Sequence, residues 1–142
     1  MTGLAAAFLT YAEKDRDRSP HTLARYRAVL TSVAAFGPLD TITAEQVEDW
    51  WATRFDKSPS TRANELACLR SFFRWAARFD HRPDDPTRRL DPPRVTNHVP
   101  RPIGQTDLER LLGPLTTDAP DLRRAIALGA YSGLRVSEAA GL

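Results

Sequence analysis

Apolar residues recur three and four positions apart through residues 1–80, and this spacing predicts amphipathic helices rather than strands. The second predicted helix shows the pattern clearly, with an apolar stripe at Leu23, Tyr26, Leu30, Val33 and Ala34. In all, the pattern predicts four helices, over about 2–14, 20–36, 43–55 and 59–79. Amphipathic helices joined by short connections predict a small all-α bundle.

Polar residues mark three of the predicted helix starts. Ser19 and Ser58 are each followed by a proline, and a serine N-cap with proline at the first helical position is a favoured helix start. Thr43 has Gln46 three residues later, which predicts a capping box. These signals set the starts of the second, third and fourth helices.

Prolines interrupt the helical pattern between residues 81 and 103. Because proline removes a backbone donor and restricts φ, this stretch is expected to be an extended, semi-rigid linker. Helical periodicity returns over 106–112, where Thr106 and Glu109 predict another capping box, and over 118–131. The pattern therefore divides the chain into 1–80, 81–103 and 104–142.

The composition narrows the class of protein. Cys68 is the single cysteine, so no internal disulfide is possible; its apolar neighbours predict a small buried side chain in a cytoplasmic protein. No apolar run approaches the ~20 residues that a membrane span needs, and residues 1–10 lack the basic start of a signal peptide.

The histidines are scattered and no phosphate-binding glycine loop is present, so we expect no metal and no cofactor. Tyrosines on apolar helix faces are expected in the core: Tyr11, Tyr26 and Tyr131.

Basic residues gather on two predicted helices, although the net charge is only +2. The fourth helix carries Arg62, Arg70, Arg74 and Arg78; the start of the second carries Arg18, His21, Thr22 and Arg25. Such strips would neutralise DNA phosphates and place side chains over base edges. The alternative is a solvated face of long side chains. Because acidic residues nearly balance the basic ones, DNA binding would depend on segregation of charge.

The C-terminal stretch carries one arginine in an unusual place. A helical run meets a break at Ser132 and Gly133, Arg135 follows, and Glu138 comes three residues later. An arginine at the start of a new helix can direct its guanidinium at a phosphate oxygen, and a glutamate one turn away can hold it. The alternative is an ordinary surface arginine, since short Gly-Leu-Arg strings are common.

Three strings of the sequence, in order, resemble the tyrosine recombinases, also called phage-type integrases. Residues 132–142, SGLRVSEAAGL, are similar to the first catalytic box of that family, Thr/Ser-Gly-Leu-Arg-x-Ser-Glu-x-x-x-Leu. Residues 19–30, SPHTLARYRAVL, resemble the second helix of its core-binding domain. Residues 66–76, LACLRSFFRWA, resemble the fourth helix of the same domain.

The resemblance implies an all-α chain with a SAM-like core-binding domain at 1–80, an interdomain linker at 81–103 and the first helices of a catalytic domain at 104–142. In such proteins the second and fourth helices, with the linker, clamp double-stranded DNA, and four copies form a homo-oligomer on it. The family reading places these residues at DNA: Thr22, Arg25, Arg70, Arg74, Arg88, Arg89 and Arg101. Arg62 joins the set by its spacing on the fourth helix.

The resemblance also implies a chemistry, in which a tyrosine attacks the phosphate without a metal and arginines stabilise the charge. Arg135, supported by Glu138, matches the first of those arginines; the later His-x-x-Arg box, the lysine and the nucleophilic tyrosine have no counterpart. We therefore expect the DNA-binding portion of a site-specific recombinase that cleaves no DNA on its own. The alternatives are a truncated stand-alone DNA-binding protein and a helical protein-interaction module without a DNA role.

Overall fold

The computed structural model describes residues 3–96, 101–115 and 119–141, and every regular element within these ranges is helical. The chain forms two compact units, Met1–Thr96 and Asn97–Leu142. Among the described residues, no helix has the length and apolar character needed to cross a membrane. The predicted all-α class is confirmed.

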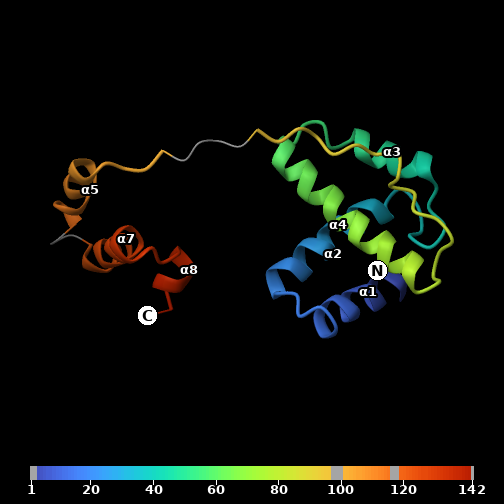
Figure 1. The fold of residues 1–142 in the computed structure, drawn as a ribbon, viewed down its shortest axis with the longest axis horizontal. Helices are drawn as coiled ribbons and strands as arrows, with labels where there is room; N and C mark the ends of the chain where they lie inside the picture. The colour runs from blue at the N-terminus through green and yellow to red at the C-terminus, as the bar shows by residue number, and fades with distance from the viewer. Residues whose placement is uncertain (1–2, 97–100, 116–118, 142) are drawn as a thin grey trace. The chain divides into compact units, whose positions relative to one another are not determined.

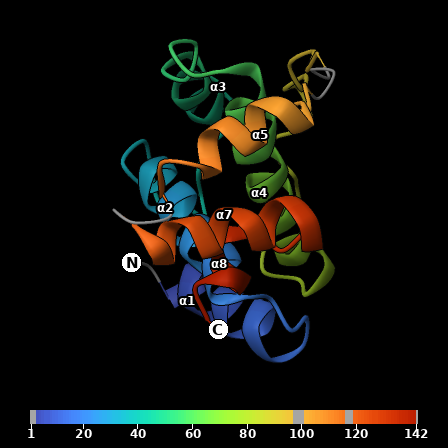
Figure 2. The same ribbon diagram turned by 90° about the vertical axis from the view of Figure 1, so that its left-hand side faces the viewer.

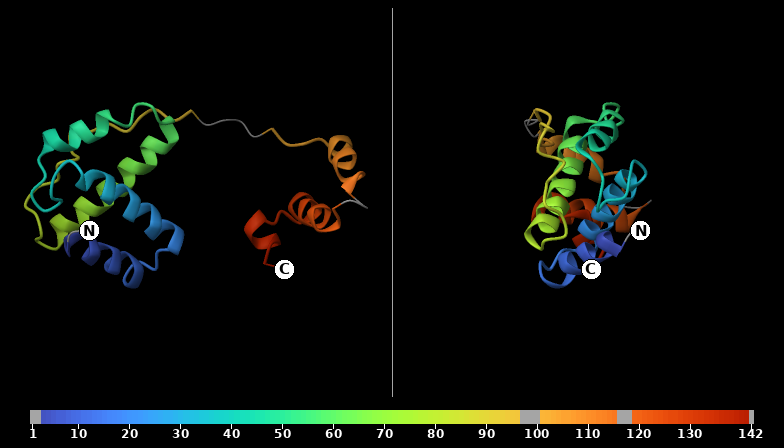
Figure 3. Two further views of the ribbon diagram at one scale, coloured as in Figure 1. Left: turned by 180° about the vertical axis from the view of Figure 1, so that it is seen from behind. Right: turned by 90° about the vertical axis from the view of Figure 1, so that its right-hand side faces the viewer.

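Four helices build the first unit: α1 (Gly3–Lys14), α2 (Pro20–Ala34), α3 (Ala44–Ala52) and α4 (Pro59–Arg78) (Figure 1). They are the four helices that the apolar spacing predicts. Helix α2 lies at the centre and packs against α1, α3 and α4, and α4 crosses it in the views from both sides (Figures 1 and 3). Helix α3 ends at Ala52, so Phe55 lies beyond it and is exposed.

The predicted caps of α2, α3 and α4 form as the sequence indicates. The Ser19 Oγ accepts the backbone N–H of Thr22 at 3.3 Å, and the Ser58 Oγ accepts that of Thr61 at 3.2 Å. Thr43 and Gln46 bond reciprocally in a capping box. Each of these hydrogen bonds satisfies an N–H group that the first helical turn leaves without a partner.

Replacing Ser58 with alanine is expected to lower the free energy of unfolding of the first unit by about 1 kcal/mol, because the cap of α4 is lost. Denaturation in urea, followed by tryptophan fluorescence, measures the change. The matched control is Ser60→Ala, two residues into the same helix and exposed, which should change stability by less than about 0.5 kcal/mol. Equal effects of the two variants would contradict the capping role.

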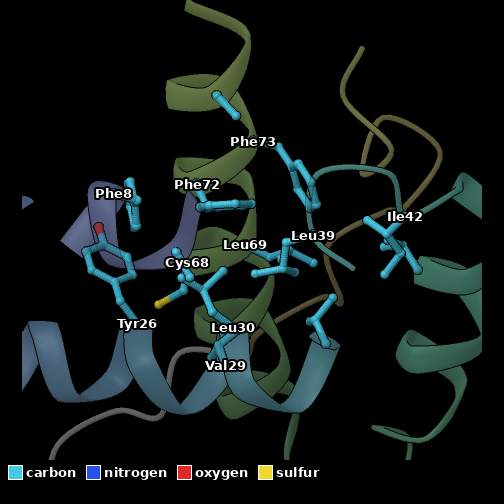
Figure 4. Close-up of a cluster of buried hydrophobic side chains, with 14 of the residues drawn as sticks. Phe8, Tyr26, Val29, Leu30, Leu39, Ile42, Cys68, Leu69, Phe72 and Phe73 are labelled. Atoms are coloured by element: carbon cyan, nitrogen blue, oxygen red, sulfur yellow. The ribbon is translucent and has the colours of Figure 1, made fainter. Parts of the chain in front are cut away.

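The core of the first unit is rich in aromatic side chains (Figure 4). Phe8 from α1 packs edge-on against Tyr26 of α2 and Phe72 of α4, with ring centroids 5.1 and 5.4 Å apart. Trp50 of α3 is buried and its indole N–H donates to the Ser32 Oγ at 3.0 Å. Edge-to-face aromatic pairs add to the stabilisation from buried area. This core fixes the angle between α2 and α4 and so positions their polar faces.

Cys68 lies inside the same cluster, between α2 and α4 (Figure 4). Its burial raises the pKa of the thiol, because the thiolate would lose its hydration. The prediction of a small buried side chain at this position is confirmed.

The first part of the proline-rich stretch folds onto the first unit. Arg82 is only 7% exposed, and Thr87 and Leu90 are buried. In Figure 1 the chain after α4 returns past α3 toward the start of α4. Residues 81–96 therefore belong to the first unit, and the role of 81–103 as an interdomain linker stays a prediction.

The second unit contains α5 (Gln105–Leu112), α7 (Pro120–Ser132) and α8 (Val136–Ala139). Helix α5 begins one residue earlier than predicted, with Gly104 as its N-cap, so Thr106 is not in the position that a capping box requires. The predicted start of the next helix, at 118, lies outside the described residues. Figure 2 shows α8 following α7 after a bend, at which Gly133 has a left-handed φ of 68°.

Few apolar side chains of the second unit are buried; among the described ones they are Leu108 and Leu112. Tyr131 is 65% exposed, so the prediction that it lies in a core is wrong. The prediction holds for Tyr26, which is buried, and Tyr11 is half-buried against the core. Tyr131 differs from Tyr26 because periodicity shows only that a helix has an apolar side. Whether that side is buried depends on the neighbouring elements that cover it.

Candidate nucleic-acid interface

A groove with four arginines lies where α1, α2 and α4 meet. It has a volume of about 260 Å³, and its floor is formed by aromatic side chains, Phe8, Tyr11, Tyr26 and Trp75. The cations that line it are Arg16, Arg18, Arg74 and Arg78. An aromatic floor with cationic walls suits a ligand that carries dispersed negative charge.

The turn between α1 and α2 brings two of these arginines to the groove. Asp17, between Arg16 and Arg18, has a φ of 46°, a left-handed conformation that aspartate adopts more readily than most residues. The backbone N–H of Arg18 donates to the Ala12 carbonyl at 3.0 Å, which holds the turn against the end of α1. This turn carries the two arginines that line the same groove as Arg74 and Arg78 of α4.

Helix α4 supplies the other two arginines of this groove by its repeat. Arg74 and Arg78 are one turn apart and both are exposed, and Ser71, one turn before Arg74, lines the same groove. The guanidinium carbon of Arg78 lies 5.8 Å from the ring centre of Phe79. The ring contact orients the side chain and leaves its donors free to bind an anion.

A second groove, of about 290 Å³, lies between α2 and the beginning of α4. Its cations are Arg25, Arg54 and Lys57, and its one carboxylate, Glu65, pairs with Lys57 at 2.6 Å. Arg54 stacks over the ring of Trp50 at 5.2 Å. Arg25 donates to His21 Nε2 at 3.4 Å, one turn away on α2.

The two grooves open on the same side of α4. Asn64 lines the second groove and Ser71 the first, and residues seven apart lie on one side of an α-helix. Among the described residues that line the grooves, seven are Arg or Lys and one is acidic. We call this surface the basic face: Arg16, Arg18, Arg25, Arg54, Lys57, Arg74 and Arg78. Seven of the twenty Arg and Lys residues of a chain with net charge +2 thus lie on this face.

Two of the predicted contact residues on α2 and α4 belong to the basic face, namely Arg25 and Arg74. Thr22 lies one turn from Arg25, half-buried, with its hydroxyl bonded to the Ser19 Oγ at 3.0 Å. Arg70 is half-buried and donates to the backbone carbonyl of Leu90. The predicted strip of Arg70, Arg74 and Arg78 is therefore divided between two open arginines and one that is engaged within the fold.

Arg62 lies away from that strip. Eight residues separate it from Arg70, which rotates it by about 80° around the helix toward α3. Its guanidinium carbon lies 4.9 Å from the ring centre of Trp51 and 4.2 Å from that of Phe55. The side chain is half-buried, and its Nε is without a hydrogen-bond partner.

The remaining predicted DNA contacts are spread over both units. Arg88 and Arg89 are exposed in the first unit, and Arg89 lies 3.9 Å from Glu48, at the limit of an ion pair. Arg101 is exposed in the second unit. All three have the solvent access that a phosphate contact requires, and their assignment to DNA stays a prediction.

Five cations of the basic face were not among the predicted contact residues. Arg18 and Arg78 belong to the predicted basic strips, whereas Arg16, Arg54 and Lys57 belong to neither set. A signal for them exists in the sequence. Both Ser-Pro helix starts are preceded by two cations within four residues, Arg16 and Arg18 before Ser19, and Arg54 and Lys57 before Ser58. Cations in the connection before a helix lie near its exposed first turn, where neighbouring helices can share them.

Arg135 and Glu138 form the pair that the sequence predicts. Arg135 is the N-cap of α8, and the Glu138 carboxylate accepts its backbone N–H at 2.7 Å and its Nη1 at 3.2 Å. The guanidinium is largely exposed, so its other donors are accessible. The left-handed Gly133 ends α7 and allows the chain to turn before this arginine.

No three His, Cys, Asp or Glu side chains among the described residues gather as metal ligands would. The chemistry offered by the described grooves is that of arginine and lysine donors, which bind anions through charge-assisted hydrogen bonds.

Comparison with known proteins decides the family. Residues 5–79 match the family "Phage integrase, N-terminal SAM-like domain". This chain belongs to the phage integrase family. The matched range contains α2 and α4, and the basic face lies within the same first unit.

Relatives of this integrase-family chain are tyrosine recombinases. It is 34% identical to XerD of Xanthomonas axonopodis pv. citri (strain 306) over 85% of its length, and 30% identical to XerD of Lacticaseibacillus casei over its full length. The integrase from mycobacterium phage Brujita has a similar structure, with a TM-score of 0.64 and 28% identity over 95% of this chain. The chain covers 43% and 52% of the two recombinases and 47% of the integrase, about half of each.

Proposed function

We propose that this chain binds double-stranded DNA through the basic face, as the DNA-binding portion of a site-specific tyrosine recombinase. The observation that carries the proposal is the segregation of seven cations against one paired carboxylate around α2 and α4. Membership of the phage integrase family supports the same function. If the arginine spacing marked only a solvated helix face, there would be no reason for cations from four separate segments to gather on one surface.

The arrangement suits a duplex for a physical reason. DNA carries a dense line of phosphates, and each arginine or lysine that neutralises one releases a condensed counterion. Arginine presents a planar fork that pairs with a phosphate through two parallel hydrogen bonds. In this proposal Arg74 and Arg78 contact the backbone along α4, and Arg25 approaches from α2. Arg88, Arg89 and Arg101 add phosphate contacts outside the basic face.

For the second unit we propose the start of a catalytic domain, in which Arg135 binds a DNA phosphate and Glu138 orients the Arg135 side chain. Support comes from the geometry of the pair: the two hydrogen bonds to Glu138 hold the backbone and the guanidinium of Arg135 together. Preorganised cationic donors stabilise the charge that develops on a phosphate during transfer. Arg135 supplies this electrostatic contribution and not a nucleophile, so we expect no strand cleavage by these residues alone.

Binding to a random-sequence duplex is expected to weaken steeply as salt rises. If all six proposed arginines contact phosphates, the logarithm of the affinity should fall with the logarithm of the salt concentration with a slope of about −5.4. Fluorescence anisotropy of a labelled duplex at several salt concentrations measures the slope. A helical protein-interaction module would show no binding at low salt, or a slope near zero, and either result would refute the proposal.

A further inference from the structure

Arg70 differs from its two neighbours on the strip. Arg74 and Arg78 are exposed, whereas Arg70 is half-buried and its Nη2 donates to the carbonyl oxygen of Leu90. Leu90 itself is buried in the core cluster, twenty residues along the chain from Arg70. A guanidinium committed to a backbone carbonyl inside the protein has fewer donors available for a phosphate.

Leu90 belongs to a segment, residues 82–92, that we call the strap. One end of the strap is held by Arg82, which donates to the carbonyls of Leu39 and Ile42 at 3.1 and 2.9 Å. Its middle forms a local turn, in which the N–H and hydroxyl of the buried Thr87 both donate to the Asp85 carboxylate, at 2.9 and 2.6 Å. Each of these contacts lies before Leu90 in the chain.

The other end of the strap runs beside α4. Pro92 lines a shallow groove of about 240 Å³ together with Ala63, Ala67, Arg70 and Arg74. Arg74 is shared between this groove and the first groove of the basic face. Pro92 and Pro93 have no N–H to donate, and the carbonyls of an extended segment need hydrogen-bond donors from outside the segment. A side-chain donor such as Arg70 can therefore hold this end of the strap through the Leu90 carbonyl.

We propose that Arg70 is a positioning residue that ties the end of the strap to α4, so that the chain leaves the first unit next to Arg74 on the basic face. That the chain leaves the first unit beside a DNA-binding surface rests on the proposed function. The hydrogen bond from Arg70 to Leu90 does not depend on it. In this assignment Arg70 acts through Leu90 and makes no phosphate contact, while Arg74, one turn later, does.

Hydrogen exchange by NMR on the full chain without DNA tests the tie. The reporter is the amide of Leu90, which donates to the Thr87 carbonyl at 3.1 Å. In Arg70→Met its exchange is expected to accelerate at least about tenfold relative to the wild type, as for loss of a hydrogen bond from a charged donor. In the matched control, Arg74→Met, the Leu90 amide should exchange at the wild-type rate.

The amide of Phe73, in the middle of α4, serves as the reference for global stability. In Ser58→Ala, which lowers the stability of the whole first unit, Phe73 should exchange faster while Leu90 keeps its wild-type rate. Unchanged exchange at Leu90 in Arg70→Met would overturn the proposal, and so would faster exchange at Leu90 in Ser58→Ala, since that would show that Leu90 reports general stability rather than release of the strap.

DNA binding gives a second and independent test. Loss of one phosphate contact reduces the slope of log affinity against log salt by about 1. That reduction is expected for Arg74→Met and not for Arg70→Met, and a reduction in Arg70→Met would overturn the positioning role. If the wild-type chain bound no DNA, the proposed function would fail while the exchange of Leu90 would still decide whether the tie exists.

Discussion

Replacing both Arg74 and Arg78 with glutamate is expected to reduce the affinity for duplex DNA at least about 100-fold at low salt, which corresponds to about 2.8 kcal/mol. The two side chains are exposed, lie one turn apart on α4 and line the four-arginine groove. Reversal removes two phosphate contacts and places two negative charges against the DNA backbone. The salt dependence should therefore also become shallower, by about 2 in slope.

Single substitutions supply the matched control for this prediction. Arg27 is exposed on α2 but lies two residues from Arg25, on another side of the helix, and lines neither groove of the basic face. Arg27→Glu changes the net charge as Arg74→Glu does, and should weaken binding far less. If the two variants lost affinity equally, binding would depend on total charge, and the basic face would not be the interface.

Replacing Arg82 with methionine is expected to lower the free energy of unfolding of the first unit by about 3 kcal/mol. The guanidinium bonds the carbonyls of Leu39 and Ile42 and the Asp84 carboxylate, the last at 2.9 Å, and stacks over Phe73 at 5.4 Å. Methionine fills much of the same space but donates no hydrogen bond. Two carbonyls in the connection between α2 and α3 would then be left without this donor, and the strap would lose its first anchor.

Urea denaturation followed by tryptophan fluorescence measures this loss. Arg88→Met is the control, because Arg88 is exposed in the same strap and its removal should change stability by less than about 0.5 kcal/mol. The salt slope of DNA binding by Arg82→Met, measured where the variant is folded, should equal that of the wild type. A loss below about 1 kcal/mol would show that the strap is not part of the stable fold.

Arg82 and Arg70 show where reasoning from spacing stops. Both lie among other arginines in the sequence, Arg82 in the proline-rich stretch and Arg70 in an i, i+4 series. In the structure each donates to backbone carbonyls from segments far away in the chain. Spacing along a helix determines the direction in which a side chain leaves the axis, but the partner in that direction comes from another part of the fold.

Arg62 adds a case within one helix. The sequence places it two turns before Arg70, and a strip was the natural interpretation, yet the accumulated rotation turns it toward Trp51 and Phe55. The basic face gained Arg16, Arg54 and Lys57 for the opposite reason: residues in connecting turns have no helical periodicity to reveal their direction, and the crossing of α2 and α4 brought them to common grooves.

The sequence by itself determined the four helices of the first unit, the starts of three of them, the break at Gly133 and the Arg135–Glu138 pair. These features depend on apolar periodicity and on hydrogen bonds between residues a few positions apart, both of which are written locally in the chain. Only the tertiary structure decided which arginines remain open to a ligand and which hold the fold together. That division depends on long-range packing, because a guanidinium bonds whichever carbonyl, ring or carboxylate the folded chain brings within its reach.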